Sequence, residues 1–321
     1  MSDLSIPEFT FDLPCRVTNI YGHYQKIFYY IDSWDILLIP IMRGDHSIVA
    51  LVQMKSSESK KENLKASVEY IGEAADKKAS LVCFPEFQMA FSPPKQSPKD
   101  LANNVAEYVK GGNFISVLRR AAKRNNINVI ATIYEKNRIK NEFKVYDTAV
   151  MINNEGRIIS VYRKLHLYDA LGFKESDKLT RGNVIKSPVS TSVGNVGLMI
   201  CYDIRFPEMS RILTVNGADT LVVPSAWVHG IMKEEHWRTM VMARAIENGS
   251  YLIAPDQVGN NFSGRSMVAD PFGTVLLDMG YKQGVEVVEI DKSRIMEVRE
   301  SLPLLKNRRL DVYREYIQAF S

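Results

Sequence analysis

The sequence predicts an α/β protein in which helices cover mixed β-sheets, and two observations support this class. Short apolar runs typical of strands alternate with longer segments whose apolar residues recur every three or four positions, as on the buried face of a helix. Neighbouring strands are also joined by tight turns, and such hairpins argue against a purely parallel sheet. We therefore expect one domain, residues 46–290, with parallel and antiparallel strands in the same sheets.

The first half of this domain is expected to contain five strands and two helices. Asn153-Asn-Glu-Gly156 joins the last two strands as a hairpin, because Asn and Gly tolerate a positive φ. The predicted strands cover residues 47–53, 81–84, 127–133, 145–152 and 157–162, and the predicted helices cover residues 63–78 and the region around 114–121.

The second half repeats this alternation. Two helices are expected to end at Asn216-Gly217 and Asn248-Gly249, because glycine suits the left-handed conformation that ends a helix. Asp270-Pro-Phe-Gly273 predicts a further hairpin. The predicted strands cover residues 196–200, 220–223, 251–254, 267–269 and 274–277, and the predicted helices cover 207–215 and 234–248.

Composition is that of an ordinary globular protein. The 321 residues are 45% hydrophobic and 24% charged, and 41 basic against 37 acidic residues give a formal net charge of +4. The charges are spread along the chain, so nothing indicates a nucleic-acid partner. Residues 27–42 are the most apolar stretch, but they fall short of the roughly 20 apolar residues of a membrane span.

The three cysteines, Cys15, Cys83 and Cys201, form no CxxC pair. We therefore expect neither a disulfide framework nor a metal site, and we predict a reducing, cytoplasmic location. Cys83 lies inside an apolar strand and is expected to be a small buried hydrophobe.

The two ends of the chain differ from the domain between them. Residues 1–45 are aromatic-rich without a clear period, which predicts an N-terminal extension. A start codon assigned upstream of Met42 and an ordinary packed leader are the alternatives. Residues 291–321 are expected to form a C-terminal arm.

Three predicted strands end on residues that a thiol nucleophile needs. One apolar run ends at Cys201, a second leads to Glu86, and a third ends at Lys164. A thiolate attacks, a carboxylate can take up the thiol proton, and an ammonium can stabilise the negative charge that develops on an amide or nitrile. These residue types at strand ends predict a catalytic set, although each alone is also common as a solvated charge.

The segments around these residues resemble the signatures of the nitrilase (carbon–nitrogen hydrolase) superfamily. Phe84-Pro85-Glu86, Tyr162-Arg163-Lys164-Leu165-His166 and Cys201-Tyr202-Asp203-Ile204-Arg205-Phe206-Pro207-Glu208 match them in order, and Pro224-Ser225-Ala226-Trp227 resembles a later landmark. The resemblance covers residues 47–313. It implies a four-layer α-β-β-α sandwich with two mixed sheets, Glu86, Lys164 and Cys201 as the catalytic residues, and no metal and no organic cofactor. It also implies a homodimer or larger even-numbered oligomer, with the C-terminal arm at the subunit interface.

Other positions receive roles from the same resemblance. Glu175 corresponds to a second glutamate that orients the substrate and the water, with a surface-loop carboxylate as the alternative. Tyr202 and Trp227 are expected to contact the substrate. Asp147 stands where many members have Asn, and this difference is expected to leave the catalytic residues untouched.

Three further residues are expected to be structural. His166 lies two positions after Lys164, so an extended backbone would place both on one face. We expect His166 to pack and to form hydrogen bonds there rather than to act as a base. Arg244 and Glu247 lie three apart on a predicted helix and are expected to pair with each other.

The function predicted from this set is an amidase that hydrolyses a small linear carboxamide to an acid and ammonia through a cysteine thioester. The motif around Cys201 resembles the ω-amidase and deaminated-glutathione amidase branches. N-carbamoyl-amine hydrolysis and nitrile hydrolysis use the same three residues and remain alternatives. A catalytically silent scaffold or binding member is the alternative of another class. The expected partner is a small-molecule amide, with no nucleic acid and no membrane.

Overall fold

Two six-stranded mixed sheets form the centre of the structure, a computed structural model that describes residues 46–137, 139 and 143–318. The first sheet has the order β14 (Gly284–Asp291), β1 (His46–Gln53), β2 (Leu81–Cys83), β3 (Asn128–Glu135), β4 (Tyr146–Ile152) and β5 (Ile158–Arg163). The second has the order β13 (Val275–Asp278), β12 (Met267–Ala269), β9 (Tyr251–Ala254), β8 (Thr220–Val222), β7 (Gly194–Leu198) and β6 (Val189–Thr191).

Both sheets have the same internal plan. Three neighbouring strands are parallel, β1-β2-β3 in one sheet and β7-β8-β9 in the other, and antiparallel strands flank them on both sides. The expected hairpin between β4 and β5 is present, and its Gly156 has a φ of +77°. The predicted mixed sheets are therefore confirmed.

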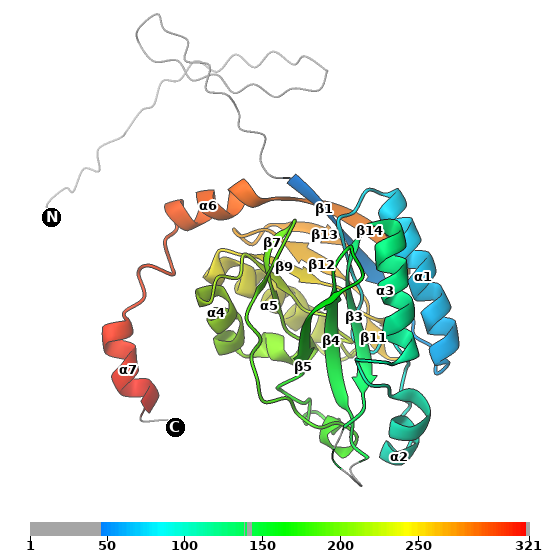
Figure 1. Ribbon diagram of the computed structural model, residues 1–321. Coiled ribbons are helices and arrows are strands. Elements are labelled where there is room, and N and C mark those ends of the chain that lie inside the picture. Colours follow the sequence, from blue (N-terminus) through cyan, green and yellow to red (C-terminus); the bar gives the residue numbers. More distant parts are fainter. Residues whose placement is uncertain (1–45, 138, 140–142, 319–321) are drawn as a thin grey trace, which may run out of the picture. The chain divides into compact units, whose positions relative to one another are not determined.

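Helices cover the outer face of each sheet (Figure 1). α1 (Lys60–Asp76) packs beside α3 (Asn113–Asn125) on the first sheet, and α4 (Pro207–Val215) packs beside α5 (Lys233–Asn248) on the second. The four layers of an α-β-β-α sandwich follow from this arrangement, as predicted. The remaining elements are short or lie near the C-terminus: α2 (Pro98–Asp100), η1 (Leu101–Val105), η2 (Glu175–Asp177), η3 (Cys201–Arg205), β10 (Val258–Gly259), β11 (Phe262–Ser263), α6 (Lys292–Ser301) and α7 (Leu310–Gln318).

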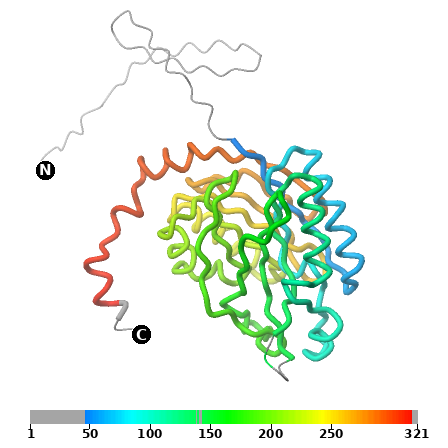
Figure 2. Tube along the Cα trace, viewed as in Figure 1, coloured from blue at the N-terminus to red at the C-terminus, as the bar shows by residue number. Residues whose placement is uncertain are grey.

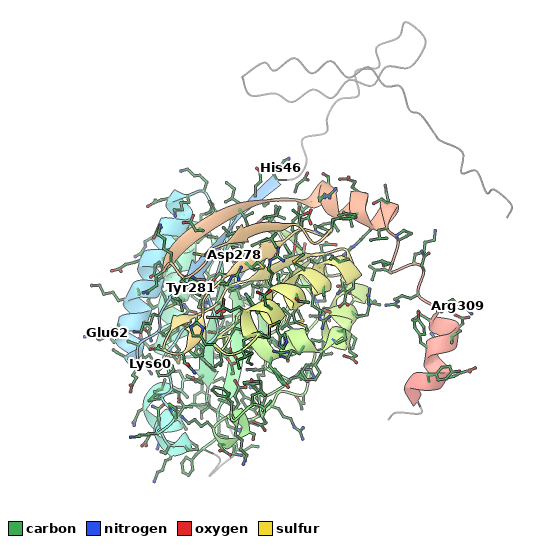
Figure 3. All side chains as sticks on the ribbon, turned by 180° about the vertical axis from the view of Figure 1, so that it is seen from behind. His46, Lys60, Glu62, Asp278, Tyr281 and Arg309 are labelled. Carbon is green, nitrogen blue, oxygen red and sulfur yellow. The ribbon has the colours of Figure 1, made fainter. Side chains whose placement is uncertain are left out.

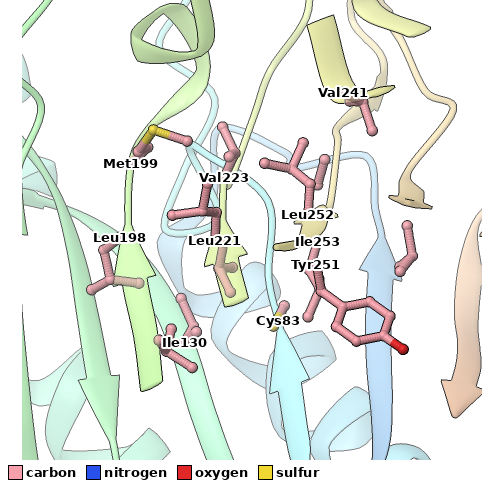
Figure 4. Close-up of a cluster of buried hydrophobic side chains, with 14 of the residues drawn as sticks. Cys83, Ile130, Leu198, Met199, Leu221, Val223, Val241, Tyr251, Leu252 and Ile253 are labelled. Carbon is pink, nitrogen blue, oxygen red and sulfur yellow. The ribbon is translucent and has the colours of Figure 1, made fainter. Parts of the chain in front are cut away.

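The apolar core lies in separate clusters because side chains alternate along each strand. On β1, Val49 and Leu51 join the cluster that the two sheets share, whereas Ala50 and Val52 join the cluster under α1 and α3. Figure 4 shows part of the shared cluster, including Cys83 of β2. Cys83 is fully buried there, as expected for a small hydrophobe.

Polar contacts attach the helices to the sheets. Lys60, labelled in Figure 3, pairs with Glu107 at 2.8 Å and donates to the Val105 carbonyl, which ties the start of α1 to the end of η1. Arg299 of α6 donates to the Gly249 carbonyl at 2.9 Å and pairs with Asp219 at 3.1 Å.

The predictions for the two ends of the chain are not tested by the contacts described above. Residues 1–45 lie outside the described part, and so do the alternatives given for them. Figure 2 follows the chain through α6 to the red C-terminal segment. The Arg299 contacts place the first helix of the predicted arm against the domain, whereas its role at a subunit interface stays a prediction. None of the described helices is long and apolar enough to cross a membrane.

Candidate active site

A buried ion cluster joins three of the predicted catalytic residues. Glu86 follows β2, Lys164 follows β5, and Glu175 opens η2. The Lys164 Nζ atom lies 2.7 Å from Glu86 Oε1 and 2.8 Å from Glu175 Oε2, and the Tyr168 backbone N–H donates to the same Glu175 oxygen. Glu86 is 0% and Lys164 is 1% exposed. Glu175 therefore belongs to the cluster and is not a free surface-loop carboxylate.

This cluster keeps Lys164 charged. Burial disfavours the ammonium, but the Glu175 and Glu86 carboxylates outweigh that effect, and the pKa of Lys164 lies well above its usual range. A permanent cation is therefore held in a site from which water is largely excluded. Electrostatic stabilisation is strongest in such a place.

Cys201 lies at a sharp turn between the second sheet and α4. β7 ends at Leu198, two residues earlier than the predicted strand, and Cys201 begins η3 with a φ of +44°. A left-handed conformation is costly for a residue with a Cβ atom, so the surroundings must hold it. The Cys201 backbone N–H donates to the Pro224 carbonyl at 2.9 Å and fixes this turn.

The resting thiol of Cys201 is neutral. Burial raises the pKa of this thiol well above its usual range, and the nearby Glu86 carboxylate raises it further, while Lys164 acts in the opposite direction. Attack as a thiolate therefore requires a base within the site, and Glu86 is the carboxylate that interacts most strongly with Cys201.

Asp203 is a further buried residue of the turn, and the sequence did not reveal its role. Its Oδ2 atom accepts from the Tyr162 hydroxyl at 2.6 Å and from the Ile200 N–H at 2.8 Å. Its Oδ1 atom faces the His166 backbone N–H at 3.1 Å and Nδ1 at 2.7 Å. One carboxylate thus links the segment after β5, which carries Lys164, to the turn that carries Cys201.

His166 packs and forms hydrogen bonds, as expected. The argument from an extended backbone does not apply, because β5 ends at Arg163 and the chain bends at Leu165 and His166. The imidazole faces Asp203 and stacks on Phe206 with ring centroids 3.7 Å apart. Arg244 and Glu247 pair at 3.1 Å, which confirms that prediction.

We expect Asp203→Ala to lower both stability and activity. The substitution leaves the buried Tyr162 hydroxyl and Ile200 N–H without their acceptor, at a cost of about 2 to 4 kcal/mol. Thermal unfolding and amide hydrolysis measured on the same preparation test this expectation. A variant with wild-type melting temperature and turnover would show that Asp203 does not hold the turn.

The Cys201 turn forms one wall of a cavity of about 720 Å³. Its lining includes Glu175, Tyr134 and both residues predicted to contact the substrate, Tyr202 and Trp227. The Trp227 indole N–H donates to the Lys233 carbonyl at 2.7 Å, so this ring is fixed as a wall. Substrate contact by Tyr202 and Trp227 stays a prediction.

Basic side chains are frequent around this cavity. Two acidic residues, Glu175 and Asp177, also line it, and Glu175 is already paired with Lys164. The basic residues of the lining are Lys95, Lys174, Lys178, Lys233 and Arg205. The Arg205 guanidinium lies 4.7 Å from the centre of the Trp227 ring. The cavity therefore has an excess of positive charge outside the ion cluster.

Asp147 adds a contact that the sequence did not suggest. Its buried carboxyl lies against that of Glu86, while the pairing of Glu86 with Lys164 is retained. Tyr134 of β3, opposite Asp147 in the strand register, also faces this group of charges. The sequence pointed to Asp147 only as a difference from the family pattern, and no sequence signal pointed to Tyr134. Within the described residues, no group of three or more His, Cys, Asp or Glu side chains could hold a metal ion.

Comparison with known proteins defines the class. Residues 48–300 match the family model described as "Carbon-nitrogen hydrolase". The chain belongs to the carbon–nitrogen hydrolase family and is a hydrolase that acts on carbon–nitrogen bonds. The resemblance inferred from the motifs is therefore confirmed.

Individual relatives indicate the branch. A deaminated glutathione amidase from Escherichia coli O157:H7 is 34% identical over 262 residues, which cover 82% of this chain and 97% of the relative. A deaminated glutathione amidase from Homo sapiens is 33% identical over 278 residues, covering 83% of each chain. The carbon-nitrogen hydrolase from Helicobacter pylori G27 has a TM-score of 0.76 at 30% identity, covering 85% of this chain and 98% of that one.

Proposed function

We propose that the protein hydrolyses a small linear carboxamide that carries a negative charge away from the amide, releasing a carboxylic acid and ammonia. The observation that carries this proposal is the meeting of Cys201 with the buried Glu86–Lys164–Glu175 cluster at the wall of a cavity with a basic lining. The names of the relatives support amide hydrolysis in general.

The reaction would proceed through a thioester on Cys201. Glu86 takes the thiol proton while sulfur attacks the amide carbon, and Lys164 with the Tyr202 backbone N–H stabilises the oxyanion. The intermediate collapses as Glu86 returns the proton to the departing nitrogen, which leaves as ammonia. Glu86 then takes a proton from water, whose oxygen attacks the thioester, and the acid leaves as the thiol is restored. Glu175 orients the amide and the water.

The basic lining favours an anionic substrate over a neutral one. Lys95 and Arg205 line the same cavity as Cys201 and could attract a carboxylate at the other end of the substrate. Opposite charges in a partly enclosed cavity attract more strongly than in open water. N-carbamoyl amines and nitriles would meet the same three catalytic residues and remain alternatives.

We expect anionic ω-amides to be better substrates than neutral amides of the same length. Ammonia release from purified protein, measured against a panel that also contains N-carbamoyl amino acids and nitriles, tests this expectation. Lys95→Gln should raise the KM for the anionic amide about 2- to 5-fold without changing kcat, because it removes one attractive charge of the cavity lining that is not part of the ion cluster. Exposed Lys65 on α1 serves as the matched control.

Three outcomes would contradict this proposal. Equal KM values for neutral and anionic amides would remove the role of the basic lining. Faster ammonia release from N-carbamoyl compounds or from nitriles than from the amides would favour N-carbamoyl-amine hydrolysis or nitrile hydrolysis instead. Absence of ammonia from every compound, with the fold intact, would favour the silent scaffold.

The oligomeric state and the cytoplasmic location stay predictions. Exposed apolar residues on the outer helices, Ile212 and Val215 of α4 and Ile246 of α5, support an interface between copies of the chain. A two-fold interface would use the same patch on both partners.

A further inference from the structure

Two buried carboxyl groups, Asp147 and Glu86, each have one oxygen for which the described residues supply no hydrogen-bond donor. Asp147 is 1% exposed and Glu86 is 0% exposed. Glu86 Oε1 accepts from Lys164, but Glu86 Oε2 and Asp147 Oδ2 have no hydrogen-bond donor among the described side chains and backbone groups. The two carboxyls are nevertheless placed for a hydrogen bond with each other. A proton held between them would supply the missing donor.

The position of Asp147 is fixed by the sheet. It lies on β4 opposite Tyr134 of β3, and its carbonyl accepts from the Lys164 N–H at 2.9 Å. Its backbone is therefore held on both sides, and its side chain is buried. The contact is part of the site and does not arise from a loose surface rotamer.

Electrostatics decide which carboxyl carries the proton. Ionisation of both of two adjacent buried carboxyls is strongly disfavoured, because the like charges repel each other. Glu86 has the Lys164 ammonium at 2.7 Å, whereas the hydrogen bonds of the described residues give Asp147 no such cation. Burial raises the pKa of Asp147 well above its usual range, and the Glu86 charge raises it further, while Lys164 lowers it.

The other groups that face Asp147 do not reverse this assignment. Glu175 adds a negative charge, which also favours the neutral acid. Tyr134 holds its own proton, because burial raises the pKa of its hydroxyl well above the usual range. Lys164 is thus the cation that opposes the effect, and it is already shared by two glutamates.

We propose that Asp147 is a neutral carboxylic acid that donates a hydrogen bond to Glu86 and thereby positions Glu86 as the base for Cys201. Asp147 is a positioning residue, and the inference rests on the proposed amidase function for its kinetic consequence. The neutral acid gives Glu86 a second partner without adding charge to the cluster. Glu86 is then fixed by Lys164 on one oxygen and by Asp147 on the other.

The pH dependence follows from the direction of the shift. The pKa of Asp147 is raised, so the neutral acid persists to higher pH than for a free aspartate and loses its proton as the pH rises. Ionisation removes the donor and adds a negative charge beside Glu86, which opposes both thiolate and oxyanion formation. Activity should therefore decline at alkaline pH because of Asp147.

Replacing Asp147 by asparagine distinguishes the effect of the hydrogen bond to Glu86 from the effect of the ionisable proton. Asp147→Asn can still donate to Glu86 but cannot ionise, so activity near neutral pH should stay within about 3-fold of wild type. The alkaline limb of the kcat/KM profile should move upward by about one pH unit or more. Asp147→Leu removes the donor and should lower kcat about 10-fold or more at every pH. Asp76→Asn, at an exposed position of α1, is the control.

Infrared spectroscopy of the resting protein gives a readout that needs no turnover. The difference spectrum of wild type minus Asp147→Asn should contain the carbonyl stretch of a protonated carboxylic acid, and the control difference should not. Absence of that band, or an unchanged alkaline limb in an active Asp147→Asn variant, would overturn the inference. A band that is present in a protein that hydrolyses no amide would support the neutral acid and contradict the proposed function alone.

Discussion

Replacement of Cys201 by alanine is expected to abolish amide hydrolysis, with a loss in kcat on the order of 10⁴- to 10⁶-fold. No other thiol can replace it within the described residues, because Cys83 is fully buried between the sheets. The melting temperature should stay close to that of wild type, since the backbone contact between Cys201 and Pro224 does not involve the removed sulfur. Kinetics and thermal unfolding measured side by side test both parts.

Cys83→Ala is the matched control and should show the reverse pattern. It removes a sulfur atom from the packed core, so stability should fall by about 1 kcal/mol while activity is retained. Mass spectrometry of the intact wild-type protein during slow turnover should show an acyl adduct that Cys201→Ala lacks. Turnover that survives in Cys201→Ala would contradict the nucleophile assignment.

Replacement of Lys164 by methionine is expected to lower kcat at least about 10²- to 10³-fold, the typical cost of losing one stabiliser of an oxyanion. The geometry adds a second effect. Glu86 and Glu175 lose their shared cation in a buried site, and breaking such a cluster costs about 3 to 5 kcal/mol. The loss of stability should be largest at neutral and alkaline pH and smaller at acidic pH, where the carboxylates can take up protons.

The double variant Lys164→Met with Glu86→Gln separates the two effects. The neutral amide relieves part of the buried charge, so the melting temperature should recover relative to Lys164→Met, whereas activity should not. Activity that returns together with stability would mean that Lys164 serves the fold alone. Glu86→Gln by itself provides the reference for the loss of the base.

The regular part of the fold was predictable because its signals are local. The helix Pro207–Val215 and the strands Tyr251–Ala254 and Met267–Ala269 have the predicted bounds, since an apolar pattern and a Gly-containing or Pro-containing boundary define each. β6 was not predicted, because Val189–Thr191 is too short to show an alternation and depends on its pairing with β7.

The composition of the site was predictable, but its interactions were not. Motifs around Glu86, Lys164 and Cys201 carry enough local sequence to be found one by one. The contact between Asp147 and Glu86 depends on the register of β3 with β4 and on the path of the chain after β2. Local sequence does not encode such a register. The role of Asp203 was missed for the same reason, although the residue itself lies inside a motif.

The candidate site takes its residues from two different sheets, so activity requires that both sheets have formed and packed against each other. Glu86 and Lys164 are 78 positions apart and belong to the first sheet, while Cys201 extends from the second. Either sheet could form with its own helices and still hold no complete reaction centre. Contacts between segments far apart in sequence are slow to form, because the loops between them must close first. A nascent or partly refolded chain would thus carry its reactive groups unassembled, and enzymatic competence would arrive only in the last stage of folding.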